Sequence, residues 1–300
     1  MAGSGLAQPP ATESGFVQVE PDVRLYYQRY GTGTPTVFIP NRLELVHAFA
    51  SLLPFHDVVT WDPRGRGLSD RPTASERYGI DAELADVEVL RRHFGAERVT
   101  YVGTSLWGNL AVLYAARHPE SVAGVVAMAP LPIAHGLRRD SLKRPMPNVH
   151  AQRLELDRMR VDGRIRSQPY AYCVLEKCVE YADSYVDPAA MAPFLAANLC
   201  QYANEQASRQ ALVIDGMFRS FGRWDWRADA EAVVAPVLLL FGEHETWRTD
   251  GVRAYADHLR DVGWLEVPRA GHHLWNDRAD VVLPMLDAFF RGGWPEGVNR

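Results

Sequence analysis

Short, continuous apolar runs recur along the chain and are separated by polar segments of unequal length. Strands that are apolar throughout are buried on both faces, which is typical of a parallel sheet covered by helices. We therefore predict strands of a mainly parallel sheet at Thr36–Ile39, Asp57–Trp61, Val99–Val102, Val122–Met128, Pro236–Phe241 and Trp264–Val267.

Helical patterns lie between several of these runs. The periodic apolar positions are Ile80, Leu84, Val87, Leu90 and Phe94 and, more loosely, Val281, Leu283, Leu286 and Phe289. Residues 16–30 instead alternate in two runs that meet at Glu20-Pro21-Asp22, which predicts a β-hairpin. Alternating strands and helices predict an α/β fold with an open, doubly wound, mainly parallel sheet.

Residues 131–230 break this alternation. They contain few strand-like runs, many helix-forming residues, many aromatic side chains and all three cysteines of the chain. We predict that they form a helical cap, inserted over the edge of the sheet at which the parallel strands end. The predicted organisation is a flexible N-terminal tail at 1–15, an α/β core made of 16–130 and 231–300, and the cap at 131–230.

Composition and charge narrow the class of protein. The chain has 300 residues, of which 47% are hydrophobic and 23% are charged, as is ordinary for a globular protein. A net charge of −5, without a long basic run, does not favour a nucleic-acid partner. No apolar run approaches the ~18 residues of a membrane span, so no membrane partner is expected.

Targeting signals and cysteines indicate the cytoplasm. Residues 1–15 lack the basic start and the apolar centre of a signal peptide. Cys173, Cys178 and Cys200 are odd in number and lie in one region, so a disulfide framework is not expected. We therefore expect a cytoplasmic protein, and the sequence does not indicate its oligomeric state.

The candidate chemistry begins at Gly103-Thr104-Ser105, where an apolar run passes directly into a helix-forming segment. Such a turn exposes a serine hydroxyl at a sharp bend between a strand and a helix. Glu245 and His272 each follow a later predicted strand. Because ligands collect where the strands of an open α/β sheet end, we expect these three side chains to meet there. The turn alone would be ordinary, but the order serine, carboxylate, histidine favours a catalytic site.

The chain resembles the α/β-hydrolase superfamily, in particular its branch with a helical cap, such as proline iminopeptidase-like and lactonase-like serine hydrolases. Besides the serine turn, the resemblance rests on Asp62-Pro-Arg-Gly-Arg-Gly-Leu-Ser-Asp70 and on Ala270-Gly-His272. It implies an α/β-hydrolase fold and a triad of Ser105 as nucleophile, His272 as base and Glu245 as the acid that orients the histidine. The turn at 62–70 is expected to be structural, with Arg64 paired locally.

The same resemblance suggests roles for other residues. The oxyanion hole would use the backbone N–H groups of Leu106 and Arg42. The expected substrate pocket consists of Trp107, Asn41, His273 and Trp275. Asp250 is the alternative to Glu245 as the acid, and His273 is expected to be a neighbour of the base rather than the base itself.

Two positions depart from the family pattern. Trp107 stands where the second glycine of Gly-x-Ser-x-Gly belongs, so its indole is expected to line the pocket or to pack under the cap. Pro40-Asn41-Arg42 replaces a His-Gly loop, although asparagine at position 41 tolerates a positive φ. Both departures bear on the oxyanion hole and therefore on the type of reaction.

The leading hypothesis is a serine hydrolase that cleaves an ester, lactone, thioester or small amide of a hydrophobic small molecule through an acyl-enzyme. The first alternative is a lyase, cyclase or isomerase on the same fold that uses His272 as acid and base, and the second is a non-catalytic small-molecule binder. No cofactor is expected. No metal is expected either, because adjacent residues such as His272 and His273 point to opposite faces of an extended chain.

Overall fold

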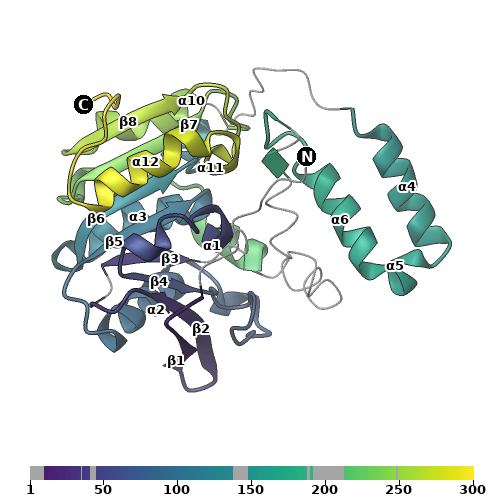
Figure 1. Cartoon of the computed structure of the whole chain (residues 1–300), viewed down its shortest axis with the longest axis horizontal. Helices are drawn as coiled ribbons and strands as arrows, with labels where there is room; N and C mark the ends of the chain where they lie inside the picture. The colour runs from purple at the N-terminus through teal and green to yellow at the C-terminus, as the bar shows by residue number, and fades with distance from the viewer. Residues whose placement is uncertain are drawn as a thin grey trace.

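The structure is a computed structural model that describes residues 10–34, 36–40, 45–137, 148–187, 190–191, 213–247 and 249–300. Eight strands form one sheet in the order β1-β2-β4-β3-β5-β6-β7-β8 (Figure 1). They are β1 (Glu13–Glu20), β2 (Val23–Tyr30), β3 (Val37–Pro40), β4 (Val58–Trp61), β5 (Val99–Thr104), β6 (Val122–Met128), β7 (Val237–Gly242) and β8 (Val262–Val267). The α-helices include α1 (Leu45–Ala48), α2 (Ile80–His93), α3 (Leu106–Arg117), α4 (His150–Val161), α5 (Arg164–Ser167), α6 (Pro169–Glu180), α9 (Arg227–Ala232), α10 (Thr249–Arg253), α11 (Leu274–Asp277) and α12 (Ala279–Phe290).

The strand directions confirm the predicted α/β fold. β1 and β2 form the antiparallel hairpin expected for residues 16–30, and β2 is also antiparallel to β4. The other neighbouring strands, from β4 through β3 and β5 to β8, are parallel. Each predicted apolar run lies on one of the strands β3–β8, and the two predicted helices correspond to α2 and α12.

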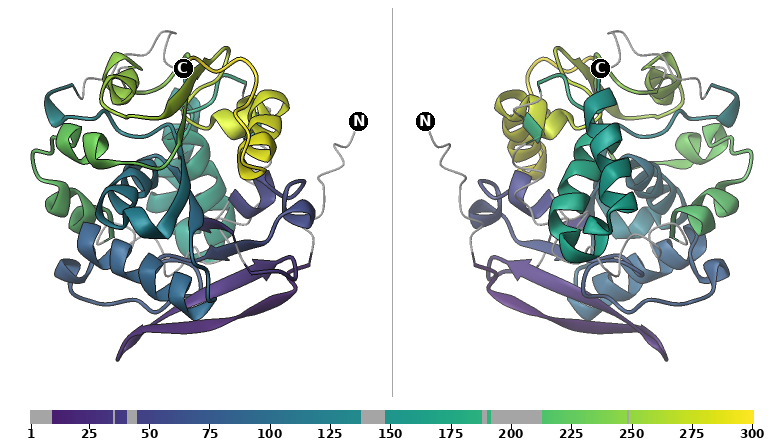
Figure 2. Two further views of the ribbon diagram at one scale, coloured as in Figure 1. Left: turned by 90° about the vertical axis from the view of Figure 1, so that its left-hand side faces the viewer. Right: turned by 90° about the vertical axis from the view of Figure 1, so that its right-hand side faces the viewer.

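Helices cover both faces of the sheet (Figure 2). One hydrophobic core joins the sheet to α2, α3 and α9, and a second core joins the opposite face to α1, α11 and α12. Neighbouring residues of β5 show the division, because Tyr101 packs in the first core and Val102 in the second. Burial on both faces explains why the strands are apolar throughout rather than alternating.

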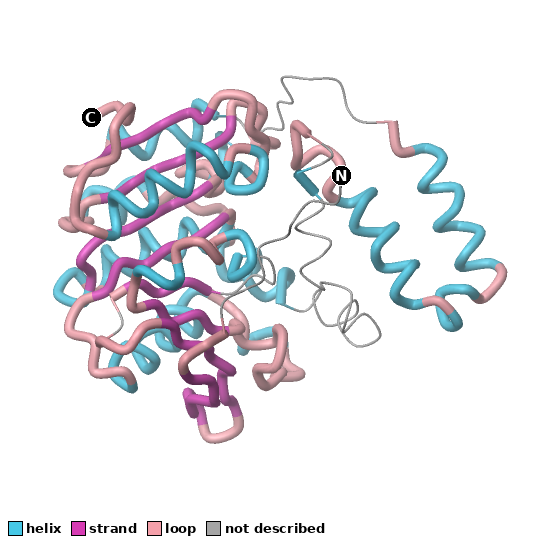
Figure 3. The backbone as a smooth tube through the Cα atoms, in the orientation of Figure 1, coloured by secondary structure: helices cyan, strands magenta, loops and turns pink. Residues whose placement is uncertain are grey.

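The described part of the predicted insertion is largely helical (Figure 3). Helices α4, α5 and α6 form a hairpin, drawn at the right of Figure 1, away from the sheet. Leu156, Met159 and Tyr172 pack between its two long helices. Cys173, Tyr185 and Met191 form another small cluster. These helices are therefore held together by their own contacts.

The segments that border the insertion pack into the main core. The Trp226 N–H donates to the Ile133 carbonyl at 2.9 Å, and the Trp224 indole N–H donates to the Pro132 carbonyl at 2.9 Å. Trp224 and Trp226 stack with ring centroids 5.2 Å apart and belong to the core on the α3 face. Residues 213–221 are helical and contribute to that core as well. The predicted range of 131–230 for the cap thus includes segments that pack with the α/β core.

The state of the cysteines differs in part from what the sequence predicts. Cys173 is disulfide-bonded, and Cys178 is a free, half-buried cysteine. Cys200 lies outside the described residues. We expected no disulfide framework, but Cys173 takes part in a bridge, because an odd number of cysteines does not exclude a disulfide. Within the described ranges, no helix is both long and apolar enough to cross a membrane.

Candidate active site

The three residues of the predicted triad follow three parallel strands. Ser105 directly follows β5, Glu245 follows β7 and His272 follows β8. Because β5, β6, β7 and β8 are parallel neighbours, the ends of these strands lie along one edge of the sheet. The fold therefore brings the serine, the carboxylate and the imidazole to the same edge, as predicted from their order along the chain.

Ser105 occupies a sharp turn between β5 and α3. Its backbone has φ 54° and ψ −131°, a conformation that is rarely adopted by a residue with a side chain. The Ser105 N–H donates to the Met128 carbonyl at 2.8 Å, which anchors the turn to the neighbouring strand β6. A Cβ atom at Gly103 would lie only 2.0 Å from the Trp107 carbonyl oxygen. The turn thus requires glycine at position 103, which explains the Gly-x-Ser pattern.

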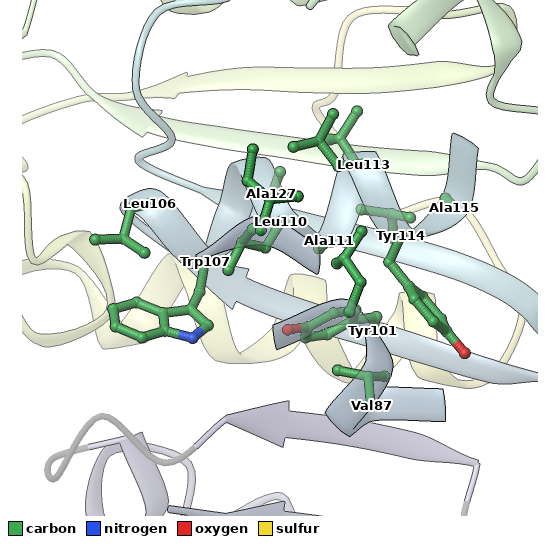
Figure 4. Packing of buried hydrophobic residues seen from close by; sticks show 14 of the residues in the cluster. Val87, Tyr101, Leu106, Trp107, Leu110, Ala111, Leu113, Tyr114, Ala115 and Ala127 are labelled. Carbon is green, nitrogen blue, oxygen red and sulfur yellow. The ribbon is translucent and has the colours of Figure 1, made fainter. Parts of the chain in front are cut away.

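Trp107 is fully buried at the start of α3 and belongs to the core on that face of the sheet. Figure 4 shows that Leu106 and Trp107 leave the helix in different directions. The Arg66 guanidinium carbon lies 4.4 Å from the centroid of the indole, a cation–π arrangement. The close approach of the turn is between Gly103 and the backbone of Trp107 and does not involve the side chain of Trp107, so the helix accommodates an indole there. A role for Trp107 in lining the substrate pocket stays a prediction.

His272 is hydrogen-bonded to Glu245. Its Nδ1 lies 2.7 Å from Oε1 of Glu245, whose side chain is fully buried. The same oxygen accepts hydrogen bonds from the Thr246 N–H at 2.8 Å and from its hydroxyl at 3.0 Å. Because a carboxylate only accepts, Nδ1 carries the proton of this hydrogen bond, and Nε2 is the ring nitrogen that does not contact Glu245. The alternative acid, Asp250, accepts the N–H of Gly251 at 3.0 Å. The geometry favours Glu245.

His273 and Trp275, which we expected in the substrate pocket, are both buried beside the triad. His273 Nδ1 lies 2.5 Å from the Tyr185 hydroxyl, and its ring stacks on Trp275 with centroids 5.1 Å apart. His272 and His273 use different hydrogen-bond partners, but their rings lie near each other, with centroids 5.7 Å apart. Residues 272 and 273 form a turn rather than an extended chain, so the expectation that they point to opposite faces was wrong. Contact of either residue with a substrate stays a prediction.

Of the two N–H donors predicted for the oxyanion hole, the described residues include Leu106. Leu106 is the first residue of α3, so its N–H lies at the positive end of the helix dipole, directly after Ser105. Arg42, the other predicted N–H donor, and Asn41, predicted for the substrate pocket, lie outside the described residues. The assignment of both N–H donors remains a prediction.

A buried cluster of charges lies beside Trp107. Arg64 forms a bidentate ion pair with Asp86 of α2, with nitrogen–oxygen distances of 2.6 and 2.7 Å. The expectation that Arg64 pairs within its own turn was wrong, because a buried guanidinium is stabilised most by a carboxylate that it can meet with two hydrogen bonds. The pKa of Glu83 is raised to about 7, chiefly by burial and in part by the Asp86 carboxylate, while Arg64, Arg66 and Trp107 oppose the rise.

Two residues that contact the His272 loop were not predicted from the sequence. Asp277, at the end of α11, accepts the Gly271 N–H at 2.8 Å. Tyr185 comes from the predicted insertion. An aspartate five positions after the histidine was a usable signal, because aspartate side chains commonly accept nearby backbone N–H groups. Tyr185 had no such signal, since its contact joins positions 88 residues apart.

Comparisons with known proteins agree with this geometry. A sequence model described as "alpha/beta hydrolase fold" matches residues 39–275. The chain is 33% identical over 76 residues to a proline iminopeptidase of Saccharolobus solfataricus, covering 25% of this chain and 24% of that protein. It is 35% identical over 104 residues to epoxide hydrolase A of Mycobacterium tuberculosis, covering 32% of each. These matches thus span a quarter to a third of the relatives' lengths.

Among solved structures, the proline iminopeptidase of Mycobacterium smegmatis superposes with a TM-score of 0.68 at 18% identity. That similarity covers 93% of this chain and 98% of the other. At this level of identity the superposition establishes a shared fold. It extends across the predicted insertion as well as the sheet, and the chemistry has to be argued from the site itself.

Proposed function

The chain belongs to the α/β-hydrolase fold family, and on this basis we propose that it is a serine hydrolase with Ser105, His272 and Glu245 as its catalytic triad. One observation carries the proposal. His272 is held through Nδ1 by a buried carboxylate at the edge of the sheet where Ser105 occupies a strained turn. This arrangement supplies a nucleophile, a base and the group that orients the base.

The proposed reaction follows from these roles. The Ser105 hydroxyl oxygen attacks the substrate carbonyl carbon while His272 Nε2 takes its proton. The negative charge that forms on the carbonyl oxygen is stabilised by the Leu106 N–H, with the Arg42 N–H as the proposed second donor. The imidazolium then protonates the leaving oxygen, sulfur or nitrogen, and an acyl-enzyme remains on Ser105. His272 finally takes a proton from water, whose oxygen attacks the acyl carbon, and returns that proton to the Ser105 oxygen as the acid is released.

The proposed substrate is an ester, lactone, thioester or small amide of a hydrophobic compound. The family relationship to proline iminopeptidase and epoxide hydrolases supports hydrolysis of a small molecule. The aromatic residues beside the base, His273 and Trp275, support an apolar binding site, as is usual for small-molecule pockets. The proposed mechanism needs no cofactor or metal ion.

Labelling with a fluorophosphonate tests the nucleophile directly. The probe forms a covalent bond to an activated serine oxygen and releases fluoride. We expect the wild-type chain to be modified at Ser105 and the Ser105→Ala variant to remain unmodified with its fold intact. Ser51→Ala, at an exposed serine, is the matched control and should label like the wild type. Hydrolysis of p-nitrophenyl esters should fall by more than about 10³-fold in Ser105→Ala.

The same experiment separates the rival reactions. Labelling at another residue, or labelling that survives in Ser105→Ala, contradicts the proposed nucleophile. Turnover that persists in Ser105→Ala but is lost in His272→Ala would favour a lyase, cyclase or isomerase that uses the histidine alone. Absence of labelling and of turnover would favour a binding protein.

A further inference from the structure

A segment of the predicted insertion is bonded directly to the loop that carries His272. We call this contact the clasp and define it as residues 184–187 on one side and residues 271–277 on the other. Its two sides are far apart in sequence, and both are largely buried or half-buried. The clasp therefore joins the insertion to the base of the proposed triad.

Asp277 makes the central contact of the clasp. Its Oδ2 atom accepts the Gly271 N–H at 2.8 Å and the Val186 N–H at 3.0 Å. Its Oδ1 atom accepts the Asp187 N–H at 3.2 Å. One carboxylate thus holds backbone donors from both sides. Hydrogen bonds to an ionised acceptor are about twice as strong as neutral ones, so this group has a large influence on how the two sides meet.

Tyr185 makes a second contact from the side of the insertion. Its buried hydroxyl lies 2.5 Å from His273 Nδ1, and the Asn276 amide donates to the same hydroxyl at 3.3 Å. The tyrosine ring also meets the His273 ring edge to face, with centroids 4.7 Å apart. The position of Tyr185 therefore constrains the residue that directly follows His272.

The backbones of the two sides approach closely at Gly271. A Cβ atom added there would lie 2.5 Å from the Ser184 carbonyl oxygen, so a larger residue cannot occupy this position without a shift. The same Ser184 oxygen accepts the His273 N–H at 3.2 Å. The residues on both sides of His272 in the chain are thus held by the clasp.

We propose that Asp277 and Tyr185 are positioning residues, which make the orientation of His272 depend on whether residues 184–187 of the insertion are bound to residues 271–277. The N–H groups of Gly271 and His273, the residues on either side of His272, are bonded to clasp residues, so a displacement of residues 184–187 moves the imidazole relative to Ser105. The base is then aligned only while the insertion is in place. This inference rests on the proposed serine hydrolase function for its effect on catalysis, but the coupling itself can be measured without turnover.

The coupling is tested by hydrogen–deuterium exchange of the full-length protein. Asp277→Asn keeps the shape of the side chain but leaves one acceptor oxygen for three backbone donors. We expect amide exchange to accelerate about tenfold both at Gly271 and at Val186–Asp187. Tyr185→Phe should accelerate exchange about fivefold across 271–277, although the substitution lies in the insertion. Asp280→Asn, at an exposed carboxylate paired with Arg278 on the adjacent helix, is the matched control and should change neither segment.

The positioning role is tested by two further measurements on folded protein. The downfield proton resonance of His272 Nδ1–H, which reports its bond to Glu245, should broaden in Asp277→Asn and persist in Asp280→Asn. The rate constant for fluorophosphonate labelling, corrected for the folded fraction, should fall about tenfold in Asp277→Asn, because small misplacements of a reacting group slow reactions strongly.

Each result has a distinct meaning. Exchange that rises only on the side that bears the substitution overturns the coupling. Coupled exchange together with an unchanged His272 resonance and labelling rate overturns the positioning role, because the contacts would then be structural alone. If the wild type is not labelled at all, the serine hydrolase function fails, whereas the exchange and resonance data still decide whether the clasp positions His272.

Discussion

The two sides of the proposed triad differ in what holds them. Ser105 is fixed by the backbone of the α/β core, through β5, α3 and its hydrogen bond to Met128. His272 is fixed by Glu245 of the core on one side and by the clasp with the insertion on the other. The nucleophile therefore forms with the sheet, whereas the base also depends on a segment outside it.

This difference suggests how one fold supports different substrates. A serine turn built from core backbone keeps the same geometry whatever covers the site. A base that is held partly by the insertion responds to changes in the insertion. Changes on the Ser105 side should therefore reduce the stability of the whole fold strongly, whereas changes on the His272 side should cost less stability and should also slow the reaction.

The largest effect on stability is expected for Gly103→Ala on the Ser105 side. The added Cβ would lie 2.0 Å from the Trp107 carbonyl oxygen, and the backbones of both residues are fixed, in β5 and α3 respectively. We expect the free energy of unfolding, measured by urea denaturation, to fall by more than about 3 kcal/mol. Gly136→Ala, where a Cβ meets no atom within 4 Å, is the control and should cost little. A loss below about 1 kcal/mol at Gly103 would show that the core does not fix the turn rigidly.

A second test on the Ser105 side uses pH. Burial raises the pKa of Glu83 from its ordinary value of 4.5 to about 7. Between these values the folded state binds more protons than the unfolded state, so stability falls as pH rises and then levels off above about 7. A pKa difference of this size corresponds to about 3 kcal/mol.

Glu83→Gln removes this titration. Relative to wild type, the variant should gain about 3 kcal/mol of unfolding free energy between pH 4.5 and pH 7, as measured by urea denaturation across that range. Glu97→Gln, at an exposed glutamate, is the control. Parallel stability curves for Glu83→Gln and wild type would show that Glu83 does not titrate in this window. Exchange at the clasp should not change, since Glu83 lies on the other side of the site.

The sequence predicted the Ser105 side better than the His272 side, for a physical reason. Strand positions, the serine turn and the order of Glu245 and His272 follow from local patterns of burial and from the order of strands, and the structure brings these residues to one edge. The contact of Tyr185 with His273 joins distant segments and has no local pattern. The pairing of Arg64 with Asp86 was missed for the same reason.

Trp107 shows a different limit of the sequence pattern. The motif indicated that a small residue was needed near the start of α3, and the structure has that close approach at Gly103, four residues earlier. The indole is then accommodated by the core and by Arg66, which come from other parts of the chain. A motif records which residue types are usual at a position, whereas the space available depends on the surrounding chain.

The smallest loss of stability, combined with a clear loss of reactivity, is expected for Gly271→Ala on the His272 side. The added Cβ would lie 2.5 Å from the Ser184 carbonyl oxygen, a steric conflict similar in kind to that at Gly103. Here, however, the neighbour belongs to the insertion and can move away. We expect a loss of about 1–2 kcal/mol in unfolding free energy and a tenfold slower labelling of Ser105, which is about 1.4 kcal/mol in activation free energy. Equal labelling of folded Gly271→Ala and wild type would contradict the dependence of the base on the insertion. A stability loss as large as that of Gly103→Ala would instead show that the insertion is as rigidly fixed as the core.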